Sequence, residues 1–245
     1  MPLHTTSFFK KHYVWDRTVR CCHWVNVFCI LILSAIGLAL LNGKWLGLTT
    51  EAKILLKTIH VSVGYIFFLS LLWRIIWAFI SKNPFSRFSA LLPLEKDFKT
   101  KLIRYISHLA QGKYASTLGH NPLGKLMITL LLSLMLIQSA SGLILAGTDL
   151  YYPPFGKTIS SWIATPGNHE KIKPYSQKYI NADRYAEMRH FRSPVITTHK
   201  YIFYILMVAI VLHIVAAVFM DVKEKNGLIS AMFNGYKFFN QKPED

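Results

Sequence analysis

The sequence predicts an all-α, polytopic membrane protein, a bundle of four transmembrane helices. Hydrophobic residues make up 52% of the 245-residue chain and the mean hydropathy is +0.31. Charged residues make up only 16%, against roughly a quarter in soluble domains. The apolar residues are gathered into four blocks, at about 22–41, 59–80, 124–146 and 199–220. Each block can supply the ~20 apolar residues that a helix needs to cross a bilayer. We therefore expect residues 1–245 to form one membrane-embedded domain.

The first block follows Lys10 and Lys11, so it could also be a signal peptide. It is longer than the apolar core of a usual signal, and no clear small-x-small cleavage site follows it. Cleavage would also remove His23, one of the histidines within the apolar blocks. We interpret residues 22–41 as the first span.

Basic residues flank the spans and account for much of the formal net charge of +16. They are dense before the first span and between residues 82 and 113, whereas the link after the first span has only Lys44 and Lys53. The positive-inside rule then predicts that both termini lie in the cytoplasm. These residues should meet anionic lipid headgroups. No soluble segment joins a basic face to aromatic platforms, so we expect no nucleic-acid partner.

The segments between the spans carry weaker signals. Residues 93–112 have loose amphipathic spacing, which predicts a short helix at the cytoplasmic interface. Asn121 and Pro122 form a start signal for the third span, with Asn121 as the cap. Residues 148–197 should form a long periplasmic loop, because long loops cross the membrane largely regardless of their charge. That loop is long enough to dock a partner.

Four histidines lie within or at the ends of the apolar blocks: His23, His60, His199 and His213. His199 and His213 are fourteen residues apart, which on a helix is a rise of about 21 Å and nearly four turns. They therefore point the same way at two depths. The first and second spans each supply a histidine at one of these depths, which gives the pairs His60 with His199 and His23 with His213.

Two facing neutral imidazoles inside a helix bundle suit bis-histidine ligation of haem iron. Zinc would normally recruit three or four ligands. A proton relay would usually include Asp or Glu, and the four blocks have none before Asp221. Polar residues that join helices are the ordinary alternative, but it does not explain four histidines at two matched depths. We expect two haems, with these four histidines as axial ligands.

Other residues on the same faces support this interpretation. Gly37 is fourteen residues after His23 and would make room for the haem of the other pair. Gly64, one turn after His60, similarly removes bulk. Arg74 is fourteen residues after His60 and could pair with the propionates of the cytoplasmic haem, or could reach the headgroups instead. Arg17 and Arg20 could share the propionate role.

At these residues the chain resembles the membrane b-type cytochrome subunits of nickel–iron hydrogenases and related bacterial diheme cytochromes b. The gamma subunits of formate dehydrogenases are more distant kin. The resemblance is carried by RCCHW at 20–24, H-x-x-x-G at 60–64, the His199 and His213 pair, and HIVAAVFMDVKEKNGLISAMFNG at 213–235. It departs at GTDLYYPPFG, 147–156, in the long loop. The hydrogenase partner therefore does not follow from the resemblance.

The resemblance implies two haems b in a bacterial inner membrane. Electrons would pass between a periplasmic redox protein, either a hydrogenase-like enzyme or a c-type cytochrome, and the quinone pool. The chain would then be an electron-transfer subunit of a respiratory complex rather than its catalytic subunit. A candidate quinone contact lies around Trp24, Asn26 and His213. One rival is a stand-alone haem enzyme such as a superoxide:quinone oxidoreductase, since a basic loop could attract an anion. Another rival is a haem-free transporter, although no inverted repeat is visible.

Overall fold

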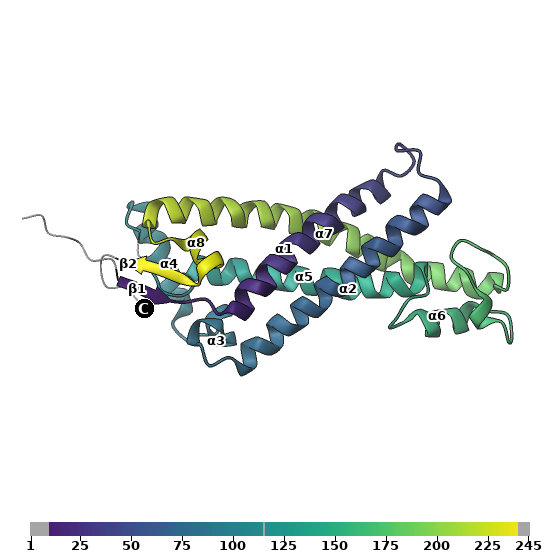
Figure 1. Cartoon of the computed structure of the whole chain (residues 1–245), viewed down its shortest axis with the longest axis horizontal. Coiled ribbons are helices and arrows are strands. Elements are labelled where there is room, and N and C mark those ends of the chain that lie inside the picture. The colour runs from purple at the N-terminus through teal and green to yellow at the C-terminus, as the bar shows by residue number, and fades with distance from the viewer. Residues whose placement is uncertain (1–9, 115, 240–245) are drawn as a thin grey trace, which may run out of the picture. The chain divides into compact units, whose positions relative to one another are not determined.

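A computed structural model describes residues 10–114 and 116–239 of the chain. Four long helices dominate it, namely α1 (Arg17–Leu41), α2 (Thr50–Ile80), α5 (Pro122–Asp149) and α7 (Ala182–Glu224), as Figure 1 shows. Each is long and apolar enough to cross a membrane, and each contains one predicted span. The predicted fold class is confirmed: the chain is an all-α, multi-pass membrane protein with four spans.

Many large apolar side chains on these helices are exposed. Phe28, Leu31 and Val211 are 61%, 62% and 59% exposed. In the most apolar stretch of α1, only 6% of the residues are buried. Exposing so much apolar surface to water would be unfavourable in free energy, so these helix surfaces are suited to contact with lipid hydrocarbon.

The described residues group into two compact units. Unit 1 holds residues 10–23, 72–114, 116–133 and 207–239, and unit 2 holds residues 24–71 and 134–206. Each of the four long helices has one end in unit 1 and the other in unit 2. The predicted ligand pairs divide in the same way, because His23 and His213 belong to unit 1 whereas His60 and His199 belong to unit 2.

Unit 1 contains a small antiparallel sheet that was not predicted. Strand β1 (Lys10–Tyr13) pairs with β2 (Tyr236–Phe239), so the two ends of the described chain are joined. Helix α8 (Leu228–Asn234) precedes β2 and ends at Gly235, whose φ of +91° is a left-handed conformation that favours glycine. Val14 and Trp15, directly after β1, pack with Ala231 of α8 in a buried cluster.

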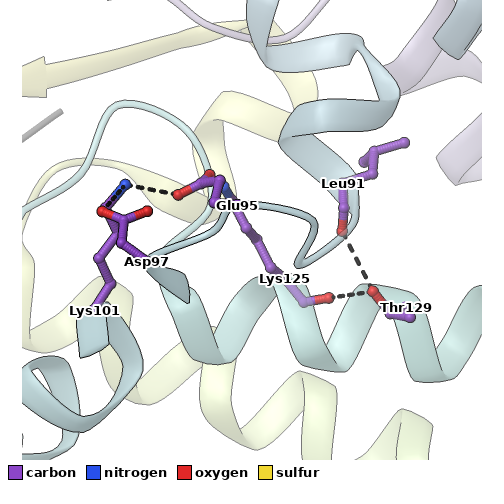
Figure 2. A network of polar contacts seen from close by, with 6 residues as sticks. All are labelled: Leu91, Glu95, Asp97, Lys101, Lys125 and Thr129. Atoms are coloured by element: carbon purple, nitrogen blue, oxygen red, sulfur yellow. Dashed lines mark hydrogen bonds and ion pairs between the residues drawn. The ribbon is translucent and has the colours of Figure 1, made fainter. Parts of the chain in front are cut away.

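The predicted helix within residues 93–112 is present as α4 (Phe98–Ala110). Before it come one 3₁₀ turn, η1 (Pro84–Ser86), and the short helix α3 (Phe88–Leu91). Figure 2 shows how the segment before α4 is tied to α5. Glu95 accepts bonds from Lys125 of α5 and from Lys101 of α4, and the Lys101 bond measures 2.7 Å. Thr129 of α5 donates to the carbonyl of Lys125 at 2.8 Å and faces the carbonyl of Leu91 at 3.4 Å.

Helix α5 begins at Pro122, and the predicted cap is confirmed. The Asn121 Oδ1 atom accepts a hydrogen bond of 2.7 Å from the backbone N–H of Gly124. This bond satisfies one of the amides that the first turn of a helix leaves without a partner.

In unit 2 the segment predicted as a loop over 148–197 is largely folded. Helix α5 runs to Asp149, α6 covers Gly156–Ile163, the 3₁₀ turn η2 covers His169–Lys171, and α7 already begins at Ala182. Ile159 and Ile163 of α6 are buried against Met188 of α7. The predicted connection between the third and fourth spans therefore contains helices, and hydropathy did not mark where α7 begins. Helix α7 instead begins where the Asn181 side chain accepts a 3.0 Å hydrogen bond from the amide of Arg184.

Candidate functional site

In unit 2 the structure brings His60 of α2 and His199 of α7 together. Their ring centres are 6.5 Å apart and the ring planes are 69° apart. The Nδ1 atom of His60 is buried and accepts or donates no hydrogen bond within residues 10–114 and 116–239. His60 and His199, which were paired from the sequence, are therefore neighbours in the structure.

Glycines leave space around this pair. A methyl group on Gly37 of α1 would lie 3.7 Å from Cε1 of His60, and one on Gly142 of α5 would lie 3.3 Å from Cε1 of His199. The second distance is tighter than an ordinary van der Waals contact, so Gly142 lets α5 approach the imidazole. A methyl group on Gly64 would meet no described atom within 4 Å. The space beside Gly64 is therefore open, and no described neighbour would clash with a larger residue's Cβ there.

Helix α5 supplies two hydrogen-bonding partners to His199. The Oγ atom of Ser141 lies 2.9 Å from Nδ1, and the Nε2 atom of Gln138 lies 3.0 Å from the imidazole Nε2. No site residue was predicted on the third span. The available signal was the presence of Gln138 and Ser141 in an otherwise apolar block, at three-residue spacing on one helix face.

An ionic cluster joins three elements of unit 2. The Asp149 carboxylate is 2.5 Å from Nζ of Lys57 and 2.6 Å from Nε of Arg192. Two cations against one carboxylate leave a net positive charge. Lys57 precedes His60 by three residues and Arg192 precedes His199 by seven, so both cations are within about two turns of a histidine on the same helix. This cluster was not predicted from the sequence.

In unit 1 the other predicted pair is His23 of α1 and His213 of α7. The two imidazoles are close enough to interact electrostatically. Trp24 and Asn26, the other two residues of the candidate quinone contact, belong to unit 2 whereas His213 belongs to unit 1.

Three arginines of unit 1 were predicted to serve the same site. Arg74 is half-buried, and its Nη1 atom donates to the carbonyl of Ser86 at 3.4 Å. Arg20 donates through Nη1 to the carbonyl of Phe233, while its buried Nε has no hydrogen-bond partner within the described ranges. Arg17, the first residue of α1, is exposed. Arg74 and Arg20 therefore have the burial that a role inside the protein requires, and Arg17 does not.

Unit 1 also buries two polar side chains that lie outside the predicted sites, His120 and Lys237. His120 stacks on Trp15 with ring centres 4.5 Å apart. Burial, together with the nearby Lys237, Arg74 and Lys125 cations, lowers the pKa of His120 to about 3. The side chain of Lys237 is 1% exposed, and its Nζ donates to the carbonyls of Thr117 and Gly119 at 3.1 and 3.2 Å.

Hydrogen bonds surround the carboxylate of Asp16, the residue directly before α1. Asp16 accepts hydrogen bonds from Asn83 (2.7 Å), Ser81 (2.9 Å) and the Trp77 indole (3.0 Å). Burial by itself would raise the pKa of Asp16, but these hydrogen bonds outweigh it and lower the pKa. The carboxylate is therefore charged where α1 begins.

The chain is similar to proteins of a known family. Residues 14–235 match the family model described as "Prokaryotic cytochrome b561". A protein of Escherichia coli K12 named "Probable Ni/Fe-hydrogenase 1 B-type cytochrome subunit" is 26% identical over 240 residues, covering 93% of this chain and 91% of its own length. A "Probable Ni/Fe-hydrogenase B-type cytochrome subunit" of Bradyrhizobium diazoefficiens is 28% identical over 240 residues, with 93% and 86% covered. The resemblance inferred from the sequence is confirmed.

Proposed function

Because the chain belongs to the prokaryotic cytochrome b561 family, it is a membrane b-type cytochrome, and we propose that it carries single electrons across a bilayer through two haems b. Membership in a family of b-type cytochromes implies haem b as the cofactor. When bound, haem iron supplies one-electron transfer. The chain's own residues must then ligate the iron, hold the propionates and exclude competing ligands.

The His60 and His199 pair fits one haem. Imidazole nitrogens bind metal ions at about 2 Å, so two rings on opposite sides of one iron would have their centres roughly 6 Å apart. The 6.5 Å separation of these rings is close to that value. The small residues Gly37 and Gly142 beside the rings, and the open space at Gly64, leave room for a porphyrin. This separation is the observation that most strongly supports the proposal.

The His23 and His213 pair would hold the second haem, fourteen residues along α7 from the first. Arg74 and Arg20, which lie half-buried in the same unit, are suited to hold its propionates by charge-assisted hydrogen bonds. Their present partners are backbone carbonyls, which a carboxylate would outcompete as acceptors. Arg17 is exposed and would contribute at most through water.

The proposed redox partner is a periplasmic protein, hydrogenase-like or a c-type cytochrome, with quinone as the other reactant. Relatives named as hydrogenase cytochrome subunits support the first of these. The folded segment with α6 would provide the docking surface, and both termini would lie in the cytoplasm of a bacterium. Quinone would react near Trp24, Asn26 or His213. The chain would thus be an electron-transfer subunit rather than a catalytic one.

Haem stoichiometry and reduced-minus-oxidised spectra of the purified protein test the cofactor assignment. We expect two haems b per chain in the wild type, and the loss of a different one in His60→Ala and in His213→Ala. His190→Ala, which removes an exposed histidine of α7, is the matched control and should keep both haems. One haem or none in the wild type would overturn the proposal.

Electron transfer itself is tested in vesicles that hold the protein and a soluble quinone analogue. Reduced hydrogenase or c-type cytochrome added outside should reduce the quinone only when both haems are present. If superoxide alone drives quinone reduction by the isolated protein, the subunit role is wrong and the stand-alone enzyme is favoured.

A further inference from the structure

Among the side chains that the function above does not use, Ser141 has the most direct contact with a proposed ligand. Ser141 lies on α5, which supplies none of the four histidines, and is 6% exposed. Its Oγ atom lies 2.9 Å from Nδ1 of His199 and 2.8 Å from the backbone carbonyl of Ile137. Both contacts lie within unit 2.

The direction of these hydrogen bonds follows from the protons available. A serine hydroxyl has one proton, and a backbone carbonyl can only accept. If Ser141 donates to Ile137, its oxygen must accept from His199, so the imidazole proton is on Nδ1. The other imidazole nitrogen gives the same answer independently. The Gln138 Nε2 group can only donate, and it lies 3.0 Å from Nε2 of His199, so Nε2 must carry a lone pair.

We propose that Ser141 is a positioning residue that fixes His199 in the Nδ1-protonated tautomer, so that Nε2 presents its lone pair to the haem iron. This inference rests on the proposed haem function. A neutral imidazole binds a metal through its unprotonated nitrogen, and the bond made by the other nitrogen decides which one that is. Ser141 supplies that bond. Gln138 lies against the nitrogen that iron would bind, so its amide would have to give up this contact if His199 ligated the iron.

The hydrogen bond also changes how strongly the imidazole donates electrons. Accepting a bond from Nδ1–H pulls the proton away from the ring and raises the basicity of the ligand. A more basic ligand stabilises ferric over ferrous iron and lowers the midpoint potential. Removing the Ser141 hydroxyl should therefore raise the potential of one haem, the one that His60→Ala loses.

The experiment compares Ser141→Ala, Ser141→Thr and Ser139→Ala in purified holoprotein by redox titration and haem retention. Ser139 is a buried serine two residues away on α5, and its Oγ has no partner among the described residues, so Ser139→Ala controls for polarity and packing. In Ser141→Ala we expect a higher potential for the haem of His60 and His199. We also expect roughly 10-fold weaker retention of that haem and an unchanged second haem. Ser141→Thr, which keeps a hydroxyl, should restore both properties.

The outcomes separate this inference from the function on which it rests. Two haems with wild-type potentials and retention in Ser141→Ala would overturn the role of Ser141 and leave the diheme function standing. An equal shift in Ser139→Ala would also overturn it, because the effect would then come from polarity in general. A wild type without haem would overturn the function itself.

Discussion

The two histidine pairs differ in what surrounds them. In unit 2, His199 has hydrogen-bonding partners on both ring nitrogens, and glycines approach both imidazoles. In unit 1, the notable groups are charges and buried polar side chains, including Arg74, Lys237 and His120. Under the proposed function, hydrogen bonds and small neighbouring residues would therefore position the haem ligands in unit 2, whereas positive charge would hold the haem carboxylates in unit 1. If so, variants in the two units should move haem properties for different reasons.

The largest expected effect is the loss of one haem on closing the space beside His199. Gly142→Leu would force a side chain into a position where even a methyl group lies 3.3 Å from Cε1 of His199. We expect the haem content to fall from two per chain to one, with the remaining haem that of His23 and His213. Ala140→Leu, at an exposed position on the same helix, is the control. Full haem content in Gly142→Leu would show that shape does not define the unit 2 site.

A second variant tests the buried polar network of unit 1. Asp16→Ala removes the acceptor of three hydrogen bonds and should lower the free energy of unfolding by about 3 kcal/mol. Thermal unfolding in detergent measures the change. Asp183→Ala, which removes an exposed carboxylate at the start of α7, should change it by less than about 0.5 kcal/mol. Equal effects of the two variants would mean that Asp16 has no special role.

A charge variant should move the potential of the unit 1 haem in the opposite direction from Ser141→Ala. Arg74→Gln removes a half-buried cation, and a cation favours the more electron-rich ferrous state. The midpoint potential of the haem of His23 and His213 should therefore fall, while the other stays the same. Redox titration resolves the two. Arg17→Gln, at an exposed position, should shift neither potential. A rise in Arg74→Gln would contradict the assignment of charge to this unit.

A pH dependence of the stability is expected to arise from His120. The pKa of His120 is about 3 in the folded chain, well below the ~6.5 of a free imidazole. Between these values the unfolded state binds a proton that the folded state does not, so this contribution to stability rises with pH across that window. It amounts to at most about 1.4 kcal/mol per pH unit. Unfolding between pH 4 and 6.5 should be less steeply pH-dependent in His120→Gln than in the wild type. Parallel stability-against-pH curves for the two proteins would show that His120 does not cause this pH dependence.

The existence of the helices and the alignment of His199 with His213 on one helix face could be predicted because both are local. Four apolar blocks identified the spans, and a fourteen-residue gap places His199 and His213 on one face of one helix. The exact ends of α7 could not be predicted in this way. Hydropathy marks only the apolar part, whereas the helix continues through the polar residues after the Asn181 cap.

By itself, the sequence determined that this chain is a four-span membrane protein with four histidines at two levels, because periodicity and hydropathy act over short distances along the chain. Only the tertiary structure decided that α5 brings Ser141 and Gln138 to His199, that Gly142 faces its ring, and that β1 pairs with β2 from the opposite end of the described chain. Such contacts depend on how separate helices approach one another. A helix face has no pattern of its own that says which residue of another helix it will meet.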